Sequence, residues 1–145
     1  MHELFAKAKE KNVSIIARVP LASGLLSGKM TKSTVFQKSD HRNFNRDGAS
    51  FNVGETFAGI PFEKGVELTE ELAALTPEGM TLSQMALRWI LDFEAVTVVI
   101  PGASRPSQVK SNASISGLNP LSKELHEKLK SFYEEKVAQH IRGPY

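Results

Sequence analysis

The turn that follows residues 96–100 is the clearest candidate for chemistry. These five residues carry no charge and are apolar apart from one threonine, which predicts a strand covered on both faces. The proline at position 101 ends the strand, because proline donates no hydrogen bond to a neighbouring strand. Gly102 then allows the backbone to pass close to a bulky group.

A helix start follows this turn and gives it a positive character. Ser104 is placed to cap the helix, and Pro106 suits the first helical turn, where a missing N–H group costs nothing. The remaining N–H groups, the helix dipole and the charge of Arg105 together predict an anion site, for which phosphate is the obvious ligand. A well-capped turn that binds nothing is the alternative interpretation of the same residues.

A second polar loop, residues 20–29, follows another apolar run at residues 13–19, which predicts a second strand. Its glycines and Lys29 suggest a phosphate-binding loop. A Walker A motif has four residues between its first glycine and its Gly-Lys pair, whereas three residues separate Gly24 from Gly28, and a methionine follows the lysine. This excludes a P-loop NTPase. A different loop over a pyrophosphate, with Lys29 as a point charge, stays open.

Regular elements must hold these two turns in place. Apolar spacing predicts helices at residues 3–12, 62–75, 81–91, 106–114 and 122–139, with Thr81 and Gln84 as a capping box. Residues 30–61 form a long polar loop. Strands that alternate with helices indicate parallel β-α units, hence an α/β fold. Because two strands leave both edges of a sheet open, we expect either self-association or pairing with a missing N-terminal half.

Composition narrows the classes of function. The 145 residues suit one domain, and the formal net charge of +2 is too small to indicate a nucleic-acid partner. The chain has no cysteine, which excludes disulfides, a thiolate zinc site and a cysteine nucleophile, and which suits a reducing, cytoplasmic setting. No apolar run is long enough to cross a membrane, so we expect no membrane partner.

Three segments together resemble the aldo-keto reductases. They are Val-Pro-Leu-Ala-Ser-Gly-Leu-Leu-Ser-Gly-Lys at 19–29, Leu-Ser-Gln-Met-Ala-Leu-Arg-Trp-Ile-Leu at 82–91, and Ile-Pro-Gly-Ala-Ser-Arg-Pro-Ser-Gln-Val-Lys-Ser-Asn at 100–112. The resemblance is to the branch that includes bacterial general-stress reductases and potassium-channel β-subunits. It implies a (β/α)8 TIM barrel, of which residues 1–145 would be a partial domain, the C-terminal half, with about strands 7 and 8 and their helices.

The resemblance also implies a site for the cofactor NADP (NADPH). One set of residues would surround the pyrophosphate: Pro20, Leu21, Ala22, Ser23, Gly24 and Lys29. A second set would hold the adenosine end and its 2′-phosphate: Gly102, Ser104, Arg105, Gln108 and Asn112. Arg42, from the long loop, would stack on the adenosine end or pair with it.

Catalysis in the family uses Asp, Tyr, Lys and His from the N-terminal half, where Tyr is the general acid. None of those motifs is present, and the four histidines show no partner pattern, so we assign no catalytic residue. The resemblance implies the cofactor-binding part of a reductase of aldehydes and ketones, with a small carbonyl substrate if the barrel is completed. A non-catalytic nucleotide-binding or protein-interaction module and a structural remnant with an empty phosphate site are the alternatives.

Overall fold

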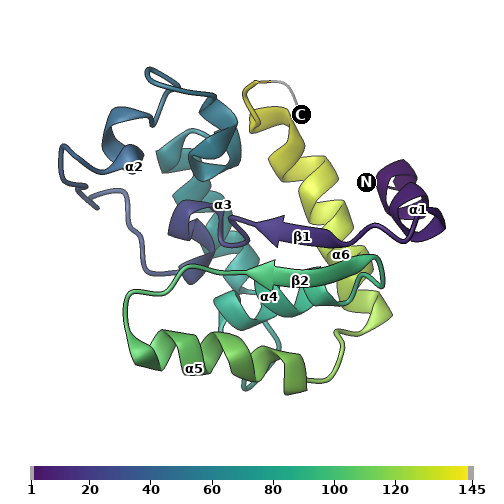
Figure 1. Cartoon of the computed structure of the whole chain (residues 1–145). Helices are drawn as coiled ribbons and strands as arrows, with labels where there is room; N and C mark the ends of the chain where they lie inside the picture. Colours follow the sequence, from purple (N-terminus) through teal and green to yellow (C-terminus); the bar gives the residue numbers. More distant parts are fainter. Residues whose placement is uncertain (1, 144–145) are drawn as a thin grey trace.

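The computed structural model describes residues 2–143. The helices are α1 (His2–Glu10), α2 (His41–Phe44), α3 (Phe62–Ala73), α4 (Leu82–Leu91), α5 (Pro106–Ser114) and α6 (Lys123–Phe132), and the strands are β1 (Ile15–Arg18) and β2 (Val96–Ile100). Figure 1 shows the two strands side by side at the centre, with helices around them. No helix within the described range combines the length and the apolar character needed to cross a membrane.

The two strands are parallel, as the alternation of strands and helices predicts. Ile15 pairs with Val96 and Arg18 pairs with Ile100, with one irregularity between Ile15 and Ile16. Because the strands run in the same direction, both end at the same edge of the sheet (Figure 1). The loops that follow them, residues 19–29 and 101–105, therefore start as neighbours.

The expectation that residues 96–100 are covered on both faces is wrong. None of the five residues is buried, and Val98 and Ile100 are 40% and 52% exposed, next to Ile16 of β1 at 59%. Helix α4 packs against β2, whereas these three side chains stay open to solvent. An apolar run thus indicates the strand correctly but does not show that its second face has a partner.

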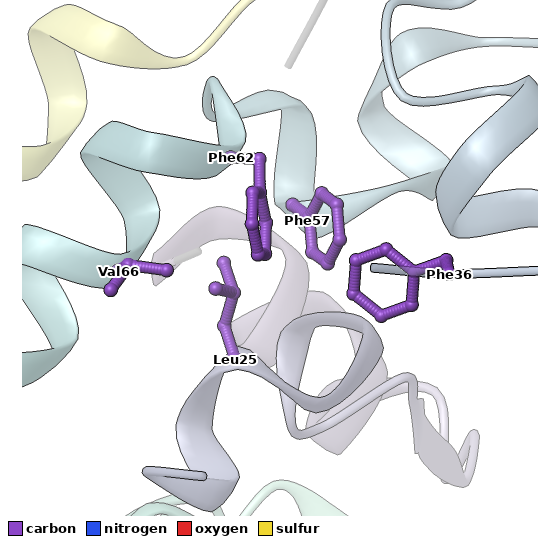
Figure 2. Packing of buried hydrophobic residues seen from close by; sticks show 5 residues of the cluster. All are labelled: Leu25, Phe36, Phe57, Phe62 and Val66. Carbon is purple, nitrogen blue, oxygen red and sulfur yellow. The ribbon is translucent and has the colours of Figure 1, made fainter. Parts of the chain in front are cut away.

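Two buried clusters stabilise the helices around the sheet. The first consists of Leu25, Phe36, Phe57, Phe62 and Val66, whose side chains converge from the segment after β1, the long loop and α3 (Figure 2). The second joins Leu82 and Met85 of α4 to Leu121, with Trp89 and Leu129 packed against them. The first cluster fixes the loop after β1 directly, because Leu25 belongs to that loop and is only 3% exposed.

The helix ends follow local signals. In the predicted capping box, the Gln84 N–H donates to Thr81 Oγ1 at 3.2 Å, and the Thr81 N–H donates to Gln84 Oε1 at 2.8 Å. The helix predicted over 122–139 begins after Ser122, but α6 ends at Phe132 and continues as a π turn, η5 (Tyr133–Val137), and a 3-10 turn, η6 (Ala138–His140). The long loop contains α2 and two 3-10 turns, η2 (Val53–Glu55) and η3 (Phe57–Gly59).

Candidate functional site

The loop after β1 has an unusual backbone. It contains the 3-10 element η1 (Ala22–Ser27), and three non-glycine residues have left-handed φ angles: Val19 at 50°, Ala22 at 46° and Ser23 at 56°. Such residues each cost on the order of 1–3 kcal/mol and persist only where their surroundings fix them. Gly24, at φ 98°, adopts a similar conformation without a side-chain penalty.

Ser23 provides one of the contacts that fix this loop. Its hydroxyl accepts a hydrogen bond from the Phe57 N–H at 3.2 Å and donates to the Glu55 carbonyl oxygen at 3.4 Å. Glu55 in turn forms an ion pair with Arg18, the last residue of β1, at 3.0 Å. The hydroxyl of Ser23 is thus committed within the protein, so a ligand over this loop would meet mainly its backbone and Lys29.

Arg42 is brought next to the same loop, although 18 positions separate it from Gly24 in the sequence. A Cβ atom built on Gly24 would lie 3.7 Å from Arg42 Nη1. The rest of the guanidinium is held by Asp40, through Nη2 at 2.6 Å and Nε at 3.0 Å, and it lies 4.6 Å from the centre of the Phe36 ring. The hydrogen bonds from Arg42 lower the pKa of Asp40 to about 2. The structure therefore places Arg42 beside the loop at 20–29, and its predicted contact with the adenosine end of a cofactor stays a prediction.

The second turn is built around Gln108 instead of Ser104, which corrects the sequence expectation. Arg105 is the N-cap residue of α5, and Pro106 occupies the first turn as expected. Gln108 Oε1 accepts from the N–H groups of Ser104 and Arg105 at 2.8 and 3.1 Å, and it lies 3.1 Å from the Ser104 hydroxyl oxygen. Asn112 Nδ2 donates to the Gly102 carbonyl oxygen at 3.4 Å. An anion at this helix start would compete with Gln108 for two of its N–H groups.

The two turns follow the carboxyl ends of neighbouring strands. Lys29 and Arg105 are both exposed, and neither takes part in an ion pair within residues 2–143. A cavity of about 300 Å³ lies at the opposite ends of the strands, where Lys9, Asn12 and Glu94 are among its lining residues. In the described part of the chain, no group of three His, Asp or Glu residues could hold a metal ion.

The sequence analysis missed a buried polar cluster centred on Asp92. Its carboxylate accepts from Arg88 Nε at 2.8 Å and from the Leu121 N–H at 2.9 Å, and His126 Nε2 lies 2.9 Å from its second oxygen. The expectation that the histidines show no partner pattern is therefore wrong for His41, whose Nδ1 lies 3.6 Å from Asp40 Oδ1, and for His126 in this cluster. No local signal marks the contact of His126 with Asp92, because 34 positions separate the two residues. The cluster fastens α6 to the end of α4, away from both turns.

The comparison with known proteins decides the family. A sequence model of the aldo/keto reductase family matches residues 1–134. The chain belongs to this family. The resemblance seen in the sequence is confirmed, and with it the assignment of the chain to a family of oxidoreductases.

Individual relatives of this aldo/keto reductase chain agree with that result. It is 34% identical over 113 residues to an L-glyceraldehyde 3-phosphate reductase of Escherichia coli O157:H7, covering 78% of this chain and 31% of that protein. It is 30% identical over 107 residues to a probable voltage-gated potassium channel subunit beta of Arabidopsis thaliana, covering 70% of this chain and 29% of that protein. The chain thus spans about a third of the length of the curated relatives it matches.

A solved structure places the fold. A glycerol dehydrogenase, AKR11B4 from Gluconobacter oxydans, superposes with a TM-score of 0.69 at 26% identity, covering 97% of this chain and 39% of that one. The α/β arrangement with its open sheet is therefore part of a (β/α)8 barrel, as predicted. In such barrels alternate residues of each strand point to the interior, which accounts for the apolar character of Ile16, Val98 and Ile100 despite their exposure here.

Proposed function

We propose that this chain is the C-terminal, NADP-binding portion of an oxidoreductase that reduces aldehydes or ketones with NADPH. The observation that carries the proposal is the shared sheet edge, where β1 and β2 end together and send out the loops 19–29 and 101–105. The carboxyl ends of parallel strands are where α/β barrels bind their ligands. Family membership supports a nicotinamide dinucleotide as that ligand.

The residues present fit the two ends of such a dinucleotide. The strained backbone of 20–24, with Lys29 beside it, suits the pyrophosphate, since backbone N–H groups and a point charge are what phosphates need. Arg105 at the start of α5 suits the 2′-phosphate that distinguishes NADP from NAD. Gln108 and Asn112 lie on the same helix and suit the adenosine. Arg42 would reach the adenosine from the long loop at residues 30–61.

The chemistry of reduction would be divided between the cofactor and groups outside these residues. When bound, the nicotinamide supplies the hydride. A carbonyl oxygen must also receive a proton from a positioned acid, and we assign no residue of this chain to that step. We therefore propose that the isolated chain binds the dinucleotide but does not catalyse reduction. Reduction of a small carbonyl substrate would require the completed barrel. The cysteine-free sequence supports a cytoplasmic setting.

Titration of the purified chain with NADPH, followed by the fluorescence of the dihydronicotinamide, tests the proposal. Saturable enhancement is expected. If the fluorescence does not change up to millimolar NADPH, the chain does not bind the cofactor. The alternatives are then a protein-interaction module and a structural remnant with an empty phosphate site. A parallel assay with small aldehydes should give no NADPH consumption, and turnover by the pure chain would overthrow our assignment of the proton donor to residues outside it.

A further inference from the structure

The C-terminal tail lies against the long loop, far from its own position in the sequence. The guanidinium of Arg142 donates to the Gly59 carbonyl oxygen at 2.8 Å, to Asp47 Oδ1 at 2.7 Å and to the Arg46 carbonyl oxygen at 3.1 Å. The Arg142 N–H donates to the Gly59 carbonyl oxygen as well, at 3.2 Å. Figure 1 shows this end of the chain beside the segment that precedes α3.

The packing between tail and loop is tight at the backbone. A Cβ atom on Gly59, whose φ is 77°, would lie 2.5 Å from the Arg142 carbonyl oxygen, closer than real contacts allow. Gly143, at φ 89°, makes a similar approach, since a Cβ atom there would lie 3.0 Å from Val53 Cγ1. Two glycines with left-handed backbones thus let the tail rest directly on residues 53–59.

The segment under the tail is held as a unit by a buried asparagine. Asn45 is 0% exposed. Its side-chain oxygen accepts from the N–H groups of Ser50 and Phe51 at 3.0 and 2.8 Å, and its nitrogen donates to Thr56 Oγ1 at 3.1 Å. Every polar atom of this amide has a partner, and a fully satisfied buried network of this kind rigidifies the backbone around it. We therefore expect a displacement of residues 45–47 to displace residues 50–56 as well.

The C-terminal end of this segment, at residues 55–57, forms hydrogen bonds with Ser23. The Phe57 N–H and the Glu55 carbonyl oxygen both bond the Ser23 hydroxyl, and Gly59, which contacts Arg142, lies in the same 3-10 turn as Phe57. A continuous path of hydrogen bonds and short backbone links therefore runs from Arg142 to the strained loop at 20–24. Strained φ angles such as those of Ala22 and Ser23 need such outside support.

We propose that Arg142 is a positioning residue for the cofactor loop: by fastening the tail to residues 45–59, it keeps Ser23 and the backbone of residues 20–24 in the conformation that meets the pyrophosphate. The proposal rests on the function proposed above for the loop. It adds that affinity for the dinucleotide depends on a residue that does not touch it and that lies 119 positions from Ser23 in the sequence.

Hydrogen exchange without cofactor, together with NADPH titration, tests this role in the full chain carrying Arg142→Ala. We expect exchange at the amides of residues 45–59 and 20–28 to rise several-fold, and the Kd for NADPH to rise about tenfold, the equivalent of one lost charge-assisted hydrogen bond. Lys136→Ala is the matched control, because Lys136 also lies near the C-terminus but pairs with Glu71 of α3 instead of the long loop. It should leave both regions unchanged.

The outcomes separate the two proposals. If exchange rises in 45–59 but stays at the wild-type rate in 20–28, the positioning role is overturned. If exchange rises in both regions while wild type shows no affinity for NADPH, the positioning role stands and the cofactor assignment fails. Should Arg142→Ala fail to fold, Asp47→Asn, which removes only an exposed ion-pair partner, must show the same pattern at smaller amplitude, and unchanged exchange in 20–28 for that variant would refute the role.

Discussion

Arg105 is the residue on which cofactor selectivity depends in our proposal. Its guanidinium is exposed at the start of α5 and has no ion-pair partner in the described residues, so it is available to a 2′-phosphate. A charge-assisted hydrogen bond is worth roughly 1.5–3 kcal/mol, and the lower end applies at an exposed position. We expect Arg105→Ala to weaken NADPH binding about tenfold and NADH binding much less.

Paired titrations with the two cofactors measure this difference. Lys110→Ala is the control, because Lys110 is another exposed cation on α5 but lies beyond its first turn. It should change both affinities little. An equal loss of NADPH and NADH affinity in Arg105→Ala would count against a role at the 2′-phosphate.

Asp92 is expected to contribute to the stability of the fold, whereas Arg105 is expected to affect only the choice between NADPH and NADH. Its side chain is 6% exposed and neutralises Arg88, whose side chain is 11% exposed. Asp92→Ala would leave Arg88 buried and unpaired and would free the Leu121 N–H and His126 as well. Breaking one half of a buried pair typically costs about 3–5 kcal/mol. Urea unfolding should show a loss of this order, whereas Glu94→Ala, two residues away and 81% exposed, should stay within about 0.5 kcal/mol.

At the scale of elements, α2 owes its start to a single carboxylate. Asp40 accepts from the Arg42 N–H at 2.9 Å as the N-cap and holds the Arg42 guanidinium at 2.6 Å. These bonds lower the pKa of Asp40 from its usual 3.8 to about 2. A lowered folded-state pKa means that the stabilisation is complete above the unfolded-state value and disappears as the pH falls through the folded-state value.

The window for Asp40 is therefore pH 4 to 2. Asp40→Asn should be less stable than wild type at pH 5 by about 1 kcal/mol, after allowance for solvent screening of a pair at the surface. The difference between the two proteins should shrink as the pH falls to 2, because the wild-type carboxyl then becomes neutral too. Chemical unfolding at several pH values measures this, and a difference that stays constant with pH would show that the ion pair contributes nothing.

The elements that were predictable from the sequence are those specified by near neighbours. Strand β2, the capping box of Thr81 and Gln84, and the start of α6 after Ser122 all rest on residues within five positions of one another. The parts that sequence analysis missed depend on distant partners. His126 meets Asp92 and Arg142 meets Asp47 only because helices and loops bring them together. Ser104 does not cap α5 because the helix begins one residue later, with Arg105 at the N-cap position, and the Gln108 side chain accepts from the N–H groups of both residues.

The whole molecule has the sequence motifs of a barrel segment, but one face of its two-stranded sheet is exposed to solvent. The family motifs predicted the partial (β/α)8 barrel and the loops that would hold the cofactor, since those motifs are short and local. They could not predict how the second face of the sheet is covered. In the described chain each strand has one neighbour and one open edge, and Ile16, Val98 and Ile100 form an exposed apolar strip beside those edges.

Open strand edges and an apolar face favour association with another chain, because unpaired backbone groups and exposed apolar area are both satisfied there. We therefore expect the purified chain to self-associate at micromolar concentration through this face. Val98→Lys places a charge at the centre of the strip and should shift sedimentation towards the monomer. Val35→Lys introduces the same charge at a position that is 88% exposed in the long loop, and it should sediment like wild type. A stable wild-type monomer at micromolar concentration would refute self-association and would show that the apolar strip stays exposed to water.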